Sequence, residues 1–193
     1  MKRLLGFGEC MVELSAAGEG LWRQGFAGDV FNTLWYGRRA LPPEWEVQFH
    51  TALGDDALSS QLLAFINGSG IACNNVMRIA GKSPGLYAIH LNNGERRFSY
   101  WRSASAARDM LGAPELLWDK VRRADVIFYS GISLAILPSD QVLKLLGDLR
   151  SKASKGAIIA FDPNIRPALW SNCRFAFKGE MTSSTKSMGL LCH

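Results

Sequence analysis

The sequence lacks the long apolar runs and the paired cysteines that mark membrane-spanning and disulfide-bonded proteins. Its apolar segments are short and interrupted by charge, so we expect no transmembrane helix. The N-terminus is basic but has no sustained apolar run and no small-residue cleavage site, so we expect no signal peptide. The cysteines (Cys10, Cys73, Cys173 and Cys192) form no C-x-x-C pair. They are typical of reduced thiols in the cytoplasm and do not fit a disulfide or zinc framework.

Two nucleotide-binding motifs are incomplete. Residues 6–8 (Gly-Phe-Gly) begin like a dinucleotide-binding fingerprint, but Met11 stands where the third glycine is needed and no helical pattern follows directly. Residues 81–83 (Gly-Lys-Ser) end like a P-loop, but Val76 stands where its first glycine belongs. Neither fragment therefore predicts a phosphate-binding loop.

The composition is that of an ordinary globular protein. The chain has 193 residues, of which 48% are hydrophobic and 20% charged, and this is enough for one hydrophobic core. No internal repeat and no disordered tract is visible. The net charge of +5 suits anionic ligands, although solubility alone also explains it.

Short apolar runs alternate with amphipathic segments along the chain. This predicts an α/β fold with a mostly parallel sheet and helices on both faces. Strands are expected at 3–8, 47–53, 76–79, 126–129 and 157–161. Helices are expected from 29 to the prolines at 42 and 43, from the cap at 54–56 to the stop at 67–70, and over 114–123 and 138–150. Ligands of such sheets bind outside the carboxyl ends of the strands.

The start of the first helix carries the strongest signal for binding. We expect Gly28 to make a tight turn and Asp29 to cap the helix, and Val30 and Phe31 to belong to its apolar face. Asn32 follows one turn in, near the exposed N–H groups, where a small polar ligand could dock. An ordinary capped core helix produces the same pattern.

A hairpin is expected over residues 86–102, around Asn92-Asn93-Gly94, because Asn-Gly favours a type I′ turn. Alternation along its strands predicts a face that carries Tyr87, Tyr100 and Arg102. Such a face could hold a hydroxylated, anionic small molecule. Ordinary cross-strand aromatics beside a solvated arginine would look the same.

Polar residues also follow the last predicted strand. Asp162, Asn164 and Arg166 stand at its carboxyl end, between the prolines at 163 and 167, which stiffen the backbone. Arg166 is a good donor to a carboxylate or a phosphate. An ion pair between Asp162 and Arg166 is the structural alternative.

These features, in their order, resemble the ribokinase-like (phosphofructokinase-B type) family of carbohydrate kinases, and within it the 2-keto-3-deoxygluconate kinases. The matching pieces are Gly-Glu-Cys-Met-Val-Glu (8–13), Phe-Ala-Gly-Asp-Val-Phe-Asn-Thr (26–33), Ala-Leu-Gly-Asp-Asp (52–56), Tyr-Trp-Arg-Ser-Ala-Ser-Ala-Ala (100–107) and Phe-Asp-Pro-Asn-Ile-Arg-Pro-Ala-Leu-Trp (161–170). Together they cover roughly residues 3 to 170.

The resemblance implies an incomplete ribokinase-like α/β domain over residues 1–170. A small β lid, made from about 15–27 and 84–104, would close over the sugar. It also implies phosphorylation of 2-keto-3-deoxygluconate with ATP and Mg²⁺. The residues implied to bind substrate are Gly28, Asp29, Val30, Phe31, Asn32, Tyr87, Tyr100, Trp101, Arg102 and Arg166, and those implied to lie near the phosphates are Asn164 and Arg166.

The family's catalytic Gly-Ala-Gly-Asp segment, which supplies an anion hole and a base, does not occur in this sequence. No residue is therefore assigned as catalytic, and Asp162 lies in the wrong place to substitute. Residues 171–193 show no helical or strand period, which suggests an atypical tail, disordered or produced by a shifted reading frame. We expect this chain alone to turn over poorly or not at all.

Two other functions fit parts of the pattern: a fructokinase-like enzyme of the same family, and a non-catalytic fragment that binds a sugar acid. A nucleic-acid binder is suggested by Arg96, Arg97 and Arg102 among aromatic residues, but one short ribbon is too small a basic surface. We therefore expect a small sugar acid as ligand, neither nucleic acid nor membrane as partner, a second copy bound through the lid, and a cytoplasmic location.

Overall fold

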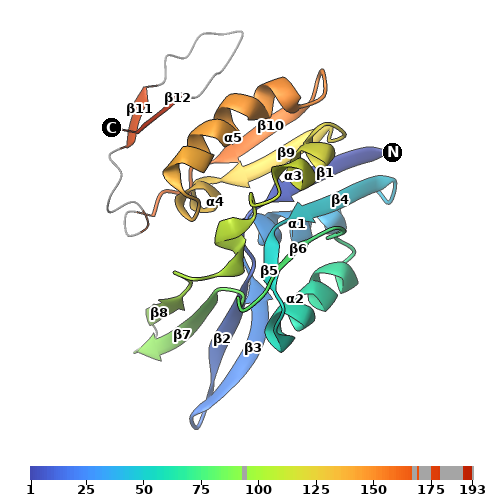
Figure 1. The fold of residues 1–193 in the computed structure, drawn as a ribbon. Helices are drawn as coiled ribbons and strands as arrows, with labels where there is room; N and C mark the ends of the chain where they lie inside the picture. Colours follow the sequence, from blue (N-terminus) through green and yellow to red (C-terminus); the bar gives the residue numbers. More distant parts are fainter. Residues whose placement is uncertain (93–94, 167–168, 170–174, 179–188, 193) are drawn as a thin grey trace.

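The computed structural model describes residues 1–92, 95–166, 169, 175–178 and 189–192 (Figure 1). Its centre is a four-stranded parallel sheet in the order β10-β9-β1-β4. The strands are β1 (Lys2–Phe7), β4 (Trp45–His50), β9 (Val126–Ser130) and β10 (Ile158–Asp162). The predicted α/β class and parallel sheet are confirmed, and all carboxyl ends of these strands lie at one edge.

Helices cover both faces of this sheet, as predicted. They are α1 (Asp29–Ala40), α2 (Ala57–Gly68), α3 (Pro114–Val121), α4 (Gly131–Ala135) and α5 (Ser139–Lys152), with a 3₁₀ turn η1 (Ala106–Asp109). On one face, Leu5 and Phe7 of β1 pack with Leu117 of α3 and Leu145 of α5. On the other face, the buried residues of α1 and α2 pack against β4. Alternation along the strands divides the core into these two layers.

The second predicted helix begins and ends where its sequence signals stand. Asp56 is the N-cap of α2, and its Oδ1 accepts a hydrogen bond of 2.7 Å from the Ser59 amide. Gly70 follows the helix with a φ of 74°, a conformation that favours glycine. The predicted strand over 47–53 is wrong in one respect, because Thr51 interrupts it and divides it into two strands. β5 (Ala52–Gly54) then pairs with β6 (Met77–Ile79) in a separate small sheet.

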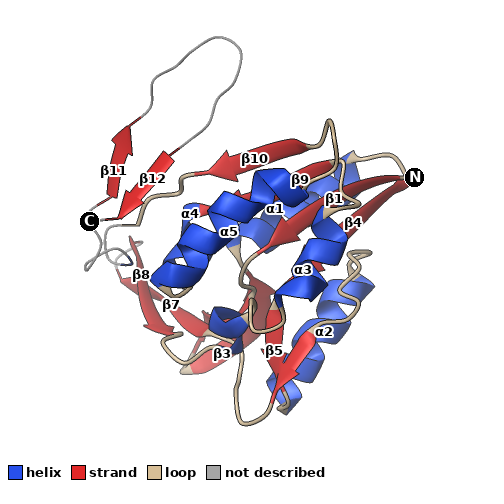
Figure 2. Ribbon diagram, turned by 45° about the horizontal axis from the view of Figure 1, so that its top comes forward, coloured by secondary structure: helices blue, strands red, loops and turns tan. Residues whose placement is uncertain are grey.

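A second four-stranded sheet lies beside the helix-covered one (Figure 2). Its order is β3 (Leu21–Ala27), β2 (Met11–Gly18), β7 (Leu86–Asn92) and β8 (Glu95–Trp101). Two antiparallel hairpins, β2/β3 and β7/β8, are joined by the parallel pair β2/β7. The first strand begins at Met11, earlier than the expected 15. The expected type I′ turn lies at 93–94, outside the described residues.

Three elements were not anticipated: one short helix and two short strands. The helix α4 has only five residues, which is too short to show a period. Two short strands, β11 (Phe175–Lys178) and β12 (Gly189–Cys192), pair antiparallel. They lie within the residues expected to form an atypical tail, and segments of four residues can pair without showing a period. In the part of the chain that the structure describes, no helix combines the length and apolarity needed to cross a bilayer.

Candidate functional site

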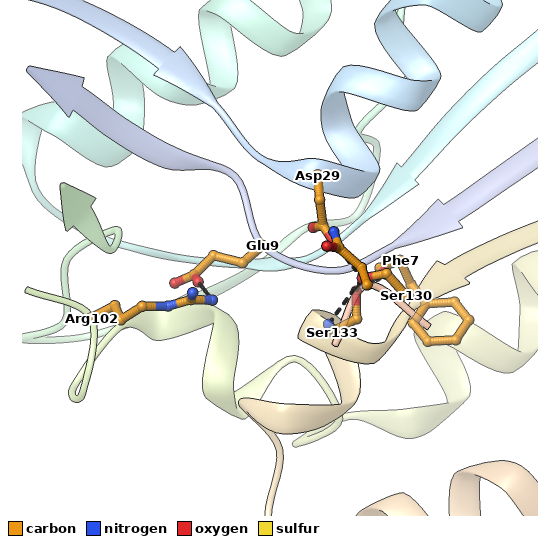
Figure 3. Close-up of polar contacts among 7 residues, drawn as sticks. Phe7, Glu9, Asp29, Arg102, Ser130 and Ser133 are labelled. Atoms are coloured by element: carbon orange, nitrogen blue, oxygen red, sulfur yellow. Dashed lines mark hydrogen bonds and ion pairs between the residues drawn. The ribbon is translucent and has the colours of Figure 1, made fainter. Parts of the chain in front are cut away.

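The loops that follow β1 and β9 meet at the carboxyl edge of the main sheet, where α1 begins (Figure 3). The loop after β10 reaches the same edge through Asn164. Ser130 ends β9 and caps α4, since its Oγ accepts from the Ser133 amide at 3.2 Å. The Ser133 hydroxyl donates in turn to the Phe7 carbonyl at 3.0 Å. These bonds fix the end of β9 against the end of β1 and hold this edge in one arrangement.

Asp29 is the polar centre of this edge. Its Oδ2 accepts a hydrogen bond from the Ser130 hydroxyl and another from Asn164 Nδ2, at 3.4 Å. Asn164 is itself held by its backbone, because its N–H donates to Asp162 Oδ1 at 3.0 Å. The first residue of α1 therefore connects the ends of β9 and β10.

The predicted roles of Gly28 and Asp29 in the turn need correction. Gly28, not Asp29, is the N-cap of α1, and its φ of −172° is extended backbone and not a tight turn. Glycine is required for another reason: a Cβ here would lie 2.2 Å from the Glu9 carbonyl oxygen. The Asp29 side chain makes no cap, because Ser130 and Asn164 engage it instead.

The next three residues of α1 differ in what they present. Val30 and Phe31 are 0% and 1% exposed and belong to the core, so only their backbone could contact a ligand. Asn32 is exposed, and its Oδ1 accepts from the Gly28 amide at 3.4 Å. Of the residues predicted in this helix, Asn32 therefore offers a side chain to solvent beside the free N–H groups of the first turn.

The second sheet brings the two predicted tyrosines together. Tyr87 of β7 lies opposite Tyr100 of β8, with ring centroids 5.8 Å apart. Tyr87 is buried and donates from its hydroxyl to Glu13 Oε2, whereas Tyr100 is 55% exposed. Burial, followed by the neighbouring Glu13 carboxylate, raises the pKa of Tyr87, so this hydroxyl keeps its proton. Trp101 pairs with Leu86 and points to the opposite face, so the structure separates it from this group.

Arg102 follows β8 and makes a buried ion pair. Its Nη2 donates to Oε2 of Glu9, and the two side chains are 11% and 2% exposed. Burial raises the pKa of Glu9, and the positive charge of Arg102 opposes that shift. The guanidinium predicted to be solvated or ligand-binding is thus held by the Glu9 side chain, and the backbone of the same glutamate packs on Gly28.

The loop after β10 does not contain the predicted alternative contact. Among the ion pairs of the described residues, none joins Asp162 to Arg166. Asp162 bonds to the Asn164 backbone instead, and Arg166 is exposed. Within the same residues, no group of three or more acidic, histidine or cysteine side chains could hold a metal ion. The Asp29 carboxylate is engaged by Ser130 and Asn164.

Sequence reasoning missed four polar residues of this region. They are Glu9, Glu13, Ser130 and Ser133. The two glutamates flank the start of β2, directly after a strand of the parallel sheet, and this position could have identified them as candidate site residues. The signal for the serines was weaker: Ser130 ends a strand and precedes a glycine.

Comparison with known proteins identifies the family. Residues 1–183 match the family model described as "pfkB family carbohydrate kinase". The chain is 42% identical over 176 residues to a 2-dehydro-3-deoxygluconokinase of Haemophilus influenzae, which covers 89% of this chain and 56% of that protein. A protein of the same name from Dickeya dadantii is 41% identical over 175 residues, with the same coverage. A fructokinase of Solanum tuberosum is 34% identical over 122 residues, 62% of this chain and 37% of that protein.

Solved structures show the same fold. A PfkB protein of a Polaromonas species superposes with a TM-score of 0.72 at 26% identity, over 88% of this chain and 58% of that one. A 2-dehydro-3-deoxygluconokinase of Thermotoga maritima has a TM-score of 0.73 at 21% identity, over 88% and 53%. A sugar kinase of Pyrococcus horikoshii in complex with ATP reaches 0.69 at 18% identity, over 88% and 55%. The chain thus spans little more than half the length of these structures and of the 2-dehydro-3-deoxygluconokinases above.

Proposed function

The chain belongs to the pfkB family of carbohydrate kinases, and we propose that it provides the sugar-binding part of an enzyme that phosphorylates 2-keto-3-deoxygluconate (2-dehydro-3-deoxygluconate) with ATP. The relatives named above favour this substrate. The observation that carries the proposal is the position of Arg102. Its guanidinium is paired with Glu9, whose backbone packs on the N-cap of α1, and it lies at the base of the sheet that presents the two tyrosines.

In this proposal the sugar acid lies between the start of α1 and the second sheet. Its hydroxyls contact Asn32 and the free N–H groups of the first helical turn, which favour partial negative charge. Its carboxylate binds guanidinium groups. A sugar acid therefore explains the presence of Arg102 and Arg166, which a neutral sugar does not. The second sheet acts as the lid, with Tyr87 and Tyr100 facing the ligand.

ATP, when bound, supplies the phosphoryl group, and we assign Asn164 and Arg166 to the phosphate side of the site. No base for the sugar hydroxyl is assigned, because the sequence contains no Gly-Ala-Gly-Asp segment. Mg²⁺, when bound together with ATP, would neutralise charge on the phosphates. The proposal therefore includes sugar binding by this chain with little or no turnover.

Three further expectations belong to the same proposal. A cytoplasmic location is favoured by Cys10 and Cys73, which are buried free thiols. Contact between the second sheets of two copies is favoured by the exposed side chain of Trp101, which lies on the face of β8 opposite the two tyrosines. The division of the chain at residue 170 stays a prediction.

The proposal is tested by calorimetric titration of the 193-residue chain with 2-keto-3-deoxygluconate and, separately, with fructose. We expect the sugar acid to bind more tightly. Arg102→Gln should weaken its binding about tenfold or more, since charge-assisted bonds contribute about 1.5–3 kcal/mol. Arg96→Gln, on an exposed part of β8, is the control and should bind like the wild type.

The outcomes separate the alternatives. Tighter binding of fructose, unaffected by Arg102→Gln, would favour the fructokinase-like function that the Solanum relative suggests. Binding of neither sugar would refute the proposal. Rapid ATP-dependent turnover by the pure chain would contradict its restriction to sugar binding.

A further inference from the structure

The ion pair between Glu9 and Arg102 joins parts of the chain that are far apart in sequence. Glu9 lies in the short link between β1 of the main sheet and β2 of the second sheet. Arg102 follows β8, the last strand of the second sheet. The pair therefore lies at the base of both hairpins, where the second sheet is attached to the main one (Figure 3).

The surroundings leave room for this pair. A Cβ at position 85 would lie 2.6 Å from Glu9 Oε1 and 3.2 Å from the Arg102 Cβ, so glycine at this position admits both side chains. The pair is nevertheless incompletely bonded: Glu9 Oε1 and Arg102 Nε are buried and have no hydrogen-bond partner among the described residues.

Stability alone is a poor explanation for such a pair. Removing two charges from water costs several kcal/mol per ion, and apolar residues of similar volume often stabilise a protein as well or better. Burial raises the pKa of Glu9, which is the direction that this cost produces. A buried pair with unused donors and acceptors is better explained by what it positions.

We infer that Glu9 is a positioning residue for sugar-acid binding: it holds the Arg102 guanidinium through Nη2, so that the remaining N–H groups face the ligand's carboxylate. This inference rests on the proposed function. A guanidinium has five N–H donors in a rigid fork, and the bond to Glu9 uses only part of them. An arginine held in advance loses less side-chain entropy when the ligand binds.

A competing role for Glu9 has the opposite sign. If the Glu9 carboxylate competed with the ligand for Arg102, removing its charge would tighten binding. If Glu9 positions Arg102, removing the charge weakens binding, and only while Arg102 is present. The direction of the change and its dependence on Arg102 therefore distinguish the two roles.

The test is a double-mutant cycle with Glu9→Gln and Arg102→Gln, in which the 193-residue chain is titrated with 2-keto-3-deoxygluconate. We expect Glu9→Gln to raise Kd about tenfold in the wild type and to have no further effect beside Arg102→Gln. The control is Glu46→Gln, which removes a different ion pair, with Arg3 at 2.9 Å, at the amino-terminal ends of β1 and β4. It should leave Kd unchanged.

Glu9→Asp gives a second measurement, because it keeps the charge on a shorter side chain. It should bind more tightly than Glu9→Gln, which a loss of structure alone would not produce. If Glu9→Gln fails to fold, Glu9→Asp takes its place in the cycle, and its Kd should exceed that of the wild type only while Arg102 is present. An unchanged or lower Kd for Glu9→Gln, or an equal loss in the Arg102→Gln background, would overturn the inference and leave the proposed function standing. Absence of sugar-acid binding in the wild type would overturn both.

Discussion

His50 makes the stability of this protein sensitive to acid. It ends β4 and is 1% exposed, and its Nε2 lies 3.0 Å from the Met110 carbonyl oxygen. A carbonyl only accepts, so Nε2 carries the proton of the neutral ring. Nδ1 is buried and has no partner among the described residues. A second proton on this ring would therefore be placed in the core without an acceptor.

The resulting pKa shift fixes the direction of the effect. Burial, and then the positive charge of Lys120, lower the pKa of His50 to about 4. Unfolded chains protonate histidine near pH 6.5, so between these values the unfolded state binds more protons than the folded state. The contribution of His50 is present above about pH 6.5 and is lost as the pH falls toward 4. From about pH 7 to about pH 4.5 the loss is about 2.5 kcal/mol.

The matched control is His50→Gln, whose side-chain amide can donate to the Met110 carbonyl but does not titrate. Urea unfolding, followed by tryptophan fluorescence at several pH values, gives the free energy of unfolding of both proteins. The difference between them should change by about 2.5 kcal/mol over this range, to the disadvantage of the wild type. Glu9 has a raised pKa and acts in the opposite direction, but it is present in both proteins and cancels. Parallel pH profiles would refute the reasoning.

Two backbone predictions use the same unfolding assay. Gly28→Ala places a Cβ 2.2 Å from the Glu9 carbonyl oxygen and should lower the free energy of unfolding by about 2 kcal/mol or more. The control is Gly147→Ala, inside α5, where a Cβ meets nothing within 4 Å; it should raise that free energy by about 0.5–1 kcal/mol. Equal effects of the two substitutions would contradict the steric argument. Asp56→Ala removes the cap on the Ser59 amide and should cost about 1 kcal/mol. Asp56→Asn, which keeps an acceptor, should recover most of that loss, and a similar cost for both would show that the cap is not the cause.

Much of the fold follows from local patterns in the sequence. The five strands predicted for the main sheet and the small β5/β6 sheet lie near their predicted positions. Apolar runs, whether alternating or continuous, depend directly on which residues are buried. The Asp56 cap and the Tyr87–Tyr100 pair were also predictable, since both partners lie within one local motif. The break at Thr51 was not, because β5 is directed by its pairing with β6, which no local pattern encodes.

The candidate site was harder to predict, because its contacts join distant segments. Asp29 was expected to act locally as a cap, yet its partners Ser130 and Asn164 come from the ends of two other strands. The bond between Glu9 and Arg102 likewise depends on the arrangement of two sheets. Spacing within a motif reports on neighbours along a helix or strand, whereas these pairs exist only after the sheets have assembled.

The parallel pair at the centre of the second sheet has a consequence for how the chain acquires its structure. Each hairpin, β2/β3 and β7/β8, is local and can close within microseconds. Val12 and Leu86 are paired in that sheet, although α1, β4 and α2 all lie between them in the sequence. Closing so long a loop is entropically costly until the intervening elements have packed. We therefore expect the two hairpins to join late in folding, after the main sheet has formed, so that the amides of β2 and β7 gain protection from hydrogen exchange after those of β1 and β4.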